Sequence, residues 1–195
     1  MSVITCLRRQ GVNMLFLLNL VTFDIAWFAS VSGGAREMPW LGPLAVLVAL
    51  TIHFRAARNP TEEALLILSC AIIGALFDSF LVASGWVTYK SGLFSEFFAP
   101  FWIITMWMLF ATTLNVSMRW LRGRPWLAAV FGLVGGPVSY LTGQKLGGIV
   151  LSNQPAAIVA LAIGWAIMMP MLMWLSENLD GMPGRRRNWI AERAR

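Results

Sequence analysis

The chain of 195 residues is 58% hydrophobic and only 12% charged, whereas a soluble domain carries about 25% charged residues. This composition excludes an ordinary soluble domain and indicates a chain surrounded by lipid. The formal charge of +6 would suggest nucleic acid as the partner of a soluble protein, but here the basic residues flank apolar segments, so no nucleic-acid partner is expected.

Six apolar stretches follow one another along the chain, each close to the ~20 residues that a helix needs to cross a ~30 Å hydrocarbon core. Turn-forming residues such as Asn59 and Pro60 separate them. The predicted fold class is therefore all-α, a membrane helical bundle of six transmembrane helices in one domain (residues 1–176), followed by a basic cytoplasmic tail (177–195). The predicted spans are 12–32, 39–57, 63–84, 98–120, 125–146 and 155–176.

Lys and Arg are distributed unequally between the two sets of flanks. One set holds twelve of them and the other only three, which are Arg36, Lys90 and Lys145. Because basic residues accumulate on the cytoplasmic side, the first set is predicted to be cytoplasmic. An even number of spans then places both termini inside, in a multi-pass protein of the bacterial inner (cytoplasmic) membrane.

The first and third predicted spans each contain an aspartate, although a charge at the bilayer centre costs at least about 2.5–3.5 kcal/mol. Asp24 and Asp78 are expected at similar depths because both spans run outward. Each carboxyl is either protonated or bonded to a neighbouring helix, or the two form a joint site as in intramembrane aspartyl hydrolases, with one acid and one base. They are the only candidates for catalytic residues, and no further motif of such enzymes accompanies them.

The fifth stretch contains a ridge of small residues at every fourth position, which predicts close packing against another helix. Pro137 removes a helical hydrogen bond and predicts a kink. Lys145 beyond it either extends to the outer interface or pairs with an aspartate, which would create an outward-facing polar pocket. The candidate binding residues are Asn19, Asp24, Asp78, Asn115, Tyr140, Gln144 and Lys145.

The sequence lacks the residues that several kinds of catalytic and cofactor site require. His53 is the only histidine, which excludes histidine-rich di-iron sites and bis-histidine haem, and its position near the end of the second span predicts an interfacial imidazole. Glu63, at the start of the third span, fits the first turn of a helix, where acids are favoured. No GxSxG, P-loop or dinucleotide-binding motif is present, so no cofactor and no metal are expected.

The chain resembles a bacterial inner-membrane family of unknown function. The resemblance rests on four segments: Asn19–Trp27, Gly74–Ser79, Pro100–Trp107 and Gly135–Tyr140 with the glycines that follow. The resemblance implies at most a role in membrane-lipid modification, through the link of such proteins to fatty-acid modification operons, and it transfers no catalytic residue.

Three functions are compatible with these features. The first is an accessory protein of membrane-lipid or envelope metabolism that binds membrane lipids, another membrane protein or a second copy of itself through its polar interior. The second is a small solute or ion transporter that uses the fifth helix and the aspartates. The third is the intramembrane aspartyl hydrolase, although an enzyme is the less favoured interpretation.

Overall fold

The computed structural model describes residues 3–183, with side chains from Met14 onward, so most of the predicted basic tail lies outside the described residues. The chain is mostly helical, as predicted, with six helices: α1 (Val3–Ala35), α2 (Leu41–Ala56), α3 (Pro60–Ala83), α4 (Phe101–Leu114), α5 (Pro125–Lys145) and α6 (Gln154–Asn178). A short 3-10 helix, η1 (Arg119–Leu121), and two strands, β1 (Val87–Tyr89) and β2 (Ile149–Leu151), lie in the connections.

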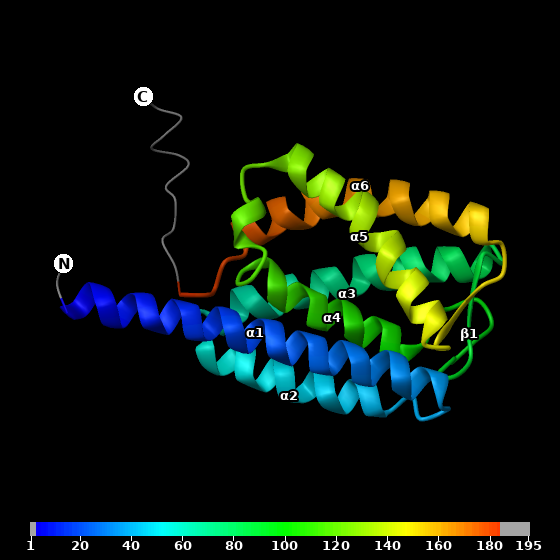
Figure 1. Ribbon diagram of the computed structural model, residues 1–195, viewed down its shortest axis with the longest axis horizontal. Helices are drawn as coiled ribbons and strands as arrows, with labels where there is room; N and C mark the ends of the chain where they lie inside the picture. Colours follow the sequence, from blue (N-terminus) through cyan, green and yellow to red (C-terminus); the bar gives the residue numbers. More distant parts are fainter. Residues whose placement is uncertain (1–2, 184–195) are drawn as a thin grey trace.

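The six helices run along the long axis of the molecule (Figure 1). α4 is the central helix, because it packs against α1, α2, α3 and α6. The start of α1, the α2–α3 connection and the end of α6 lie at one end of the bundle, and the strands lie at the other (Figure 1). The polar residues of the α2–α3 connection and of the segment after α6 therefore lie at the same end of the bundle (Figure 1).

The bundle is apolar outside and carries polar groups inside. Leu17, Ile25 and Phe28 of α1 are 57%, 62% and 55% exposed, whereas Glu63 and Asp78 are fully buried. This arrangement suits a lipid environment, in which helices associate through packing and polar contacts rather than through the hydrophobic effect. The polar interior is therefore where a site is to be sought.

Four helical segments are long and apolar enough to cross a membrane: Met14–Ala35, Pro60–Ala83, Pro125–Lys145 and Gln154–Asn178. α2 and α4 are apolar but shorter, with 16 and 14 residues, which corresponds to roughly 24 and 21 Å at 1.5 Å per residue. The chain is thus a helical protein with four candidate membrane spans and two shorter apolar helices packed among them.

α4 is shorter than the predicted span of 98–120. The backbone of Pro100 is extended, so the helix begins only at Phe101. At the other end, the Met118 amide donates to the carbonyl of Thr113 and closes a turn. Asn115 follows the last helical residue and directs its side chain into a polar cluster described below, so buried hydrogen bonds favour a turn where apolarity alone predicts more helix.

The all-α prediction misses a small antiparallel sheet. β1 pairs with β2, with Val87 opposite Leu151 and Tyr89 opposite Ile149, and these four side chains are buried. Alternate residues of a strand point to opposite faces. The sheet therefore directs Tyr89 into the bundle, where it reaches α3.

Candidate functional site

The carboxyl group of Asp78 lies at the centre of a buried hydrogen-bonded cluster. Oδ1 accepts from the hydroxyl of Tyr89 at 2.8 Å and from the hydroxyl of Tyr140, and Oδ2 accepts from Nε1 of Trp107 at 2.6 Å. The four residues come from α3, β1, α4 and α5. Burial raises the pKa of Tyr89, and the adjacent Asp78 raises this pKa further, so the hydroxyl stays protonated and donates. The cluster joins four elements through one acceptor.

Trp107 reaches Asp78 by crossing α3 at Gly74. A Cβ atom at Gly74 would lie 2.0 Å from the Trp107 ring, a distance that no side chain tolerates. Gly74 and Asp78 are one turn apart on α3, so the glycine provides the space through which the indole reaches the carboxyl. Trp107 also stacks on Trp165 of α6, with ring centroids 4.8 Å apart.

We expect Gly74→Ala to displace Trp107 and to destabilise the protein by about 1–3 kcal/mol, the usual cost of overpacking a core. The matched control is Gly135→Ala, because a Cβ atom there meets only the Phe131 ring at 3.9 Å and alanine favours the helix by about 1 kcal/mol. Thermal unfolding in detergent measures both. Equal stability of the two variants would contradict the proposed close approach.

The predicted binding residues separate into different places. Tyr140 joins Asp78 directly, whereas Asp24 is exposed on α1 and makes no hydrogen bond or ion pair with any residue in the described range. Lys145 is exposed and Gln144 is half-buried, and no ion pair within residues 14–183 joins Lys145 to an aspartate. Of the two predicted aspartates, only Asp78 is therefore buried and held by three donors, and hydrogen bonding does not pair it with Asp24.

An apolar groove lies beside this cluster. It has a volume of about 260 Å³ and is lined by residues of α1, α4, α5 and α6. Tyr140 and Trp107 form part of its wall, so the Asp78 cluster stands directly behind it. Seven aromatic side chains line the groove: Phe23, Trp27, Trp107, Phe110, Phe131, Tyr140 and Trp165.

The small residues of α5 have two different roles. The predicted ridge begins at Gly135, but the close approach to α6 is made by Gly132 and Gly136, where an added Cβ would lie 2.2 Å from the carbonyl oxygen and 2.3 Å from the ring of Trp165. Gly135 and Ser139 line the groove, as Gly132 and Gly136 also do, and Gly143 of the predicted ridge approaches Ile149 of β2, where an added Cβ would lie 2.6 Å from the side chain. The close packing of α5 is therefore divided between two neighbouring faces of the helix.

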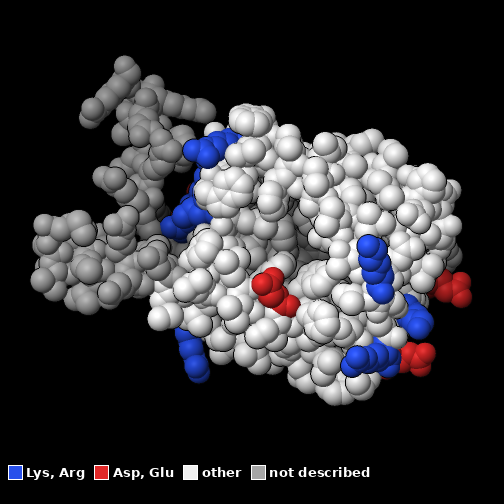
Figure 2. Space-filling model, in the orientation of Figure 1, with Lys and Arg blue, Asp and Glu red and all other residues white. Residues whose placement is uncertain are grey.

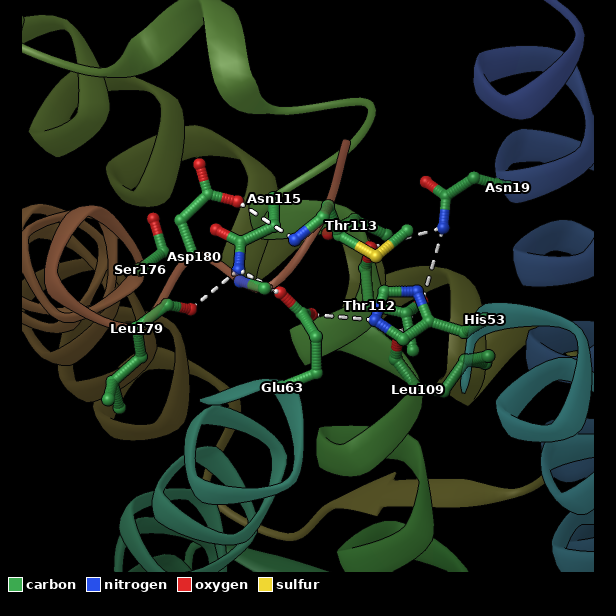
Figure 3. A network of polar contacts seen from close by, with 12 residues as sticks. Asn19, His53, Glu63, Leu109, Thr112, Thr113, Asn115, Ser176, Leu179 and Asp180 are labelled. Carbon is green, nitrogen blue, oxygen red and sulfur yellow. Dashed lines mark hydrogen bonds and ion pairs between the residues drawn. The ribbon is translucent and has the colours of Figure 1, made fainter. Parts of the chain in front are cut away.

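A second polar cluster lies at the other end of the bundle, around Glu63 (Figure 3). Its Oε2 is 2.7 Å from Nε2 of His53, and its Oε1 accepts from the Asn115 side chain at 2.7 Å and from the Gly181 amide at 2.8 Å. Asn115 also donates to the Leu179 carbonyl at 2.8 Å. A fully buried acid thus holds α2, α4 and the segment after α6 together.

Two arginines extend this cluster toward the surface. Arg119 and Arg122 each lie 2.7 Å from a different oxygen of Asp180, and Arg122 also donates to the Asn115 side chain. Burial lowers the pKa of Arg119, and the charge of Asp180 opposes this shift. Both arginines belong to the set of basic residues that predicts the topology, and in the structure they also form half-buried ion pairs.

His53 and Glu63 form a buried pair that the sequence pattern does not reveal. His53 is only 4% exposed, and Glu63 lies in the first turn of α3 as predicted but faces inward. The neighbouring asparagine, Asn19, donates to the carbonyl and the hydroxyl of Thr112 at 3.2 and 3.3 Å and belongs to the same half of the interior (Figure 3). Residues 14–183 contain no group of three or more metal-ligating side chains.

These features define a class: a mostly helical protein with apolar, membrane-compatible helices and a polar interior beside an aromatic groove. The family model described as "Protein of unknown function (DUF2878)" matches residues 16–171. The chain belongs to this family, which confirms the resemblance to a family of unknown function. No curated protein and no solved structure matches the chain.

Proposed function

We propose that the protein crosses the bacterial cytoplasmic membrane six times, with both termini inside, and binds an amphiphilic molecule of the bilayer in the aromatic groove. Its role in this proposal is that of an accessory binding protein of membrane-lipid or envelope metabolism. The observation that carries the proposal is a concave, aromatic-lined groove between apolar helices. If these helices cross the membrane, the groove faces the lipid-soluble molecules of the bilayer.

The shape of the groove supports an elongated apolar ligand. Phe131 and Ser139 at its edge are exposed, whereas Trp107 and Tyr140 behind them are buried, so the groove opens on the outer surface of the bundle. Its volume of about 260 Å³ is slightly smaller than that of typical ligand pockets, roughly 300–1,000 Å³. A chain or a small head group fits this space, while the remainder of the molecule stays in the bilayer.

Gly135→Leu tests the groove, because position 135 faces it and has no close neighbour other than the Phe131 ring at 3.9 Å. We expect the leucine to fill the space and to reduce the number of lipid molecules that remain bound after purification in mild detergent, counted by native mass spectrometry. Val134→Leu, at a position 56% exposed toward lipid, is the control. Equal lipid retention in both variants and the parent protein would overturn the proposal.

The six-span orientation has its own test. In a chain without its two cysteines, Glu96→Cys in the β1–α4 connection should react with a membrane-impermeant maleimide added to intact cells, whereas Asn178→Cys at the end of α6 should react only after lysis. Both positions are exposed, so burial does not protect either. Equal labelling of both sites in intact cells would contradict the topology.

A further inference from the structure

Asp24 occupies an unfavourable position for a residue without a partner. It is the eleventh residue of the 22-residue span Met14–Ala35, and it is exposed on the outer surface of the bundle. A carboxylate near the bilayer centre costs at least about 2.5–3.5 kcal/mol, which hydrogen bonds or an opposite charge normally offset. Nothing in the described part of the chain supplies either to Asp24.

Asp24 lies on α1 next to residues that line the aromatic groove, although its own side chain is not part of the lining. Its chain neighbour Phe23 and the residue one turn later, Trp27, both line the groove. At about 100° per residue, Asp24 is displaced about 60° from Trp27 and about 100° from Phe23 around the axis of α1. Figure 2 shows a hollow in the middle of one face of the molecule with an acidic side chain beside it, while the basic side chains of this face lie farther out on both sides.

This juxtaposition indicates the charge of the ligand. Rings of tryptophan, tyrosine and phenylalanine attract cations through their faces, by about 2 kcal/mol or more where water is excluded. A carboxyl at the edge of such an aromatic surface adds a counter-charge to the same cation. Aromatic cages of this type recognise quaternary ammonium groups, and the apolar remainder of the groove suits a hydrocarbon chain.

We propose that the groove binds an ammonium-bearing amphiphile, with Asp24 as the counter-ion and with Trp27 among the aromatic faces that contact the ammonium. This inference rests on the proposed function and specifies its ligand class. A basic side chain from a partner helix would satisfy Asp24 equally well, but it would not require a concave aromatic groove next to the carboxyl, so the ligand is the interpretation that the observations favour.

The test uses the full chain in nanodiscs of an uncharged glycolipid, which carries no ammonium group, and two probes with the same hydrocarbon chain, dodecyltrimethylammonium and the uncharged dodecanol, with binding measured by equilibrium dialysis. We expect the cation to bind about tenfold more tightly or better, as an added cation–π contact and counter-charge imply. Asp24→Asn should reduce this preference to about twofold or less, and Asp24→Glu should retain most of it. Glu96→Gln, which removes an exposed acid outside the helices, should leave the preference unchanged.

The outcomes separate this inference from the proposed function. If both probes bind equally and Gly135→Leu abolishes both, the groove is a lipid site and the ammonium inference is wrong. If Gly135→Leu changes neither probe, both proposals fail. If Asp24→Asn leaves the preference intact but lowers the oligomeric mass measured by light scattering, Asp24 pairs with a partner helix, and the ammonium inference is again overturned.

Discussion

Asp78→Ala should lower the free energy of unfolding by about 3 kcal/mol or more. The substitution removes the acceptor shared by Tyr89, Trp107 and Tyr140 and leaves three buried donors without a partner, each at a cost of about 1–3 kcal/mol. Thermal unfolding in detergent, followed by tryptophan fluorescence, measures the loss.

Asp78→Asn is the graded control for this prediction. The amide oxygen of asparagine still accepts from the two tyrosine hydroxyls, but its NH₂ group faces the N–H of Trp107, so two donors oppose each other. We therefore expect a smaller loss than in Asp78→Ala. Because the contacts share one acceptor, Tyr140→Phe should add little once Asp78 is alanine. Additive losses would show that the cluster is not a unit.

The sequence predicts the helices well because their apolar stretches are punctuated by residues that start helices. Pro60 and Pro125 occupy the first turns of α3 and α5, where a missing amide hydrogen has no cost. The sequence also predicts that Asp78 and Tyr140 share one polar region, because both are polar residues in otherwise apolar spans. The rule that polar groups face the interior of a bundle is sufficient at both positions.

The remaining partners could not be found by the same rule. Trp107 reads as an interfacial aromatic, since periodicity does not reveal that Gly74 opens a path for its indole to Asp78. Tyr89 depends on a two-stranded pairing between residues more than 50 positions apart, which neither strand predicts alone. Asp24, like Asp78, is an aspartate within an apolar span, but Asp24 is exposed and Asp78 is buried. The position of a residue around the helix axis, rather than its depth, decides which polar residues meet.

The His53–Glu63 pair shows a signal that sequence analysis can use. The two residues lie ten positions apart, at the facing ends of α2 and α3, which are antiparallel and joined by a short connection. The two helices pack against α4 rather than against each other, but a short connection keeps the last turn of α2 near the first turn of α3, so an acid and a histidine at these ends are expected neighbours. First-turn acids are usually explained by the helix dipole, and that explanation conceals the tertiary contact.

Glu63→Ala is expected to cost about 3–5 kcal/mol, the usual penalty for removing one member of a buried charged network. The loss should be accompanied by release of the segment after α6, because the amide of Gly181 donates to Glu63 at 2.8 Å. Hydrogen–deuterium exchange at Gly181 and thermal unfolding in detergent measure the two effects. Glu37→Ala, which removes an exposed acid at the opposite end of the bundle, is the control.

Glu63→Gln separates the charge of this residue from its hydrogen bonds. The amide oxygen of glutamine retains the contacts to Asn115 and Gly181, and its NH₂ group donates to Nε2 of His53 when the imidazole carries its proton on Nδ1. If the cluster acts through hydrogen bonds, this variant stays close to the parent protein in stability and keeps Gly181 protected. A loss as large as that of Glu63→Ala would instead show that the negative charge holds the segment, through Arg119 and Arg122 beyond it.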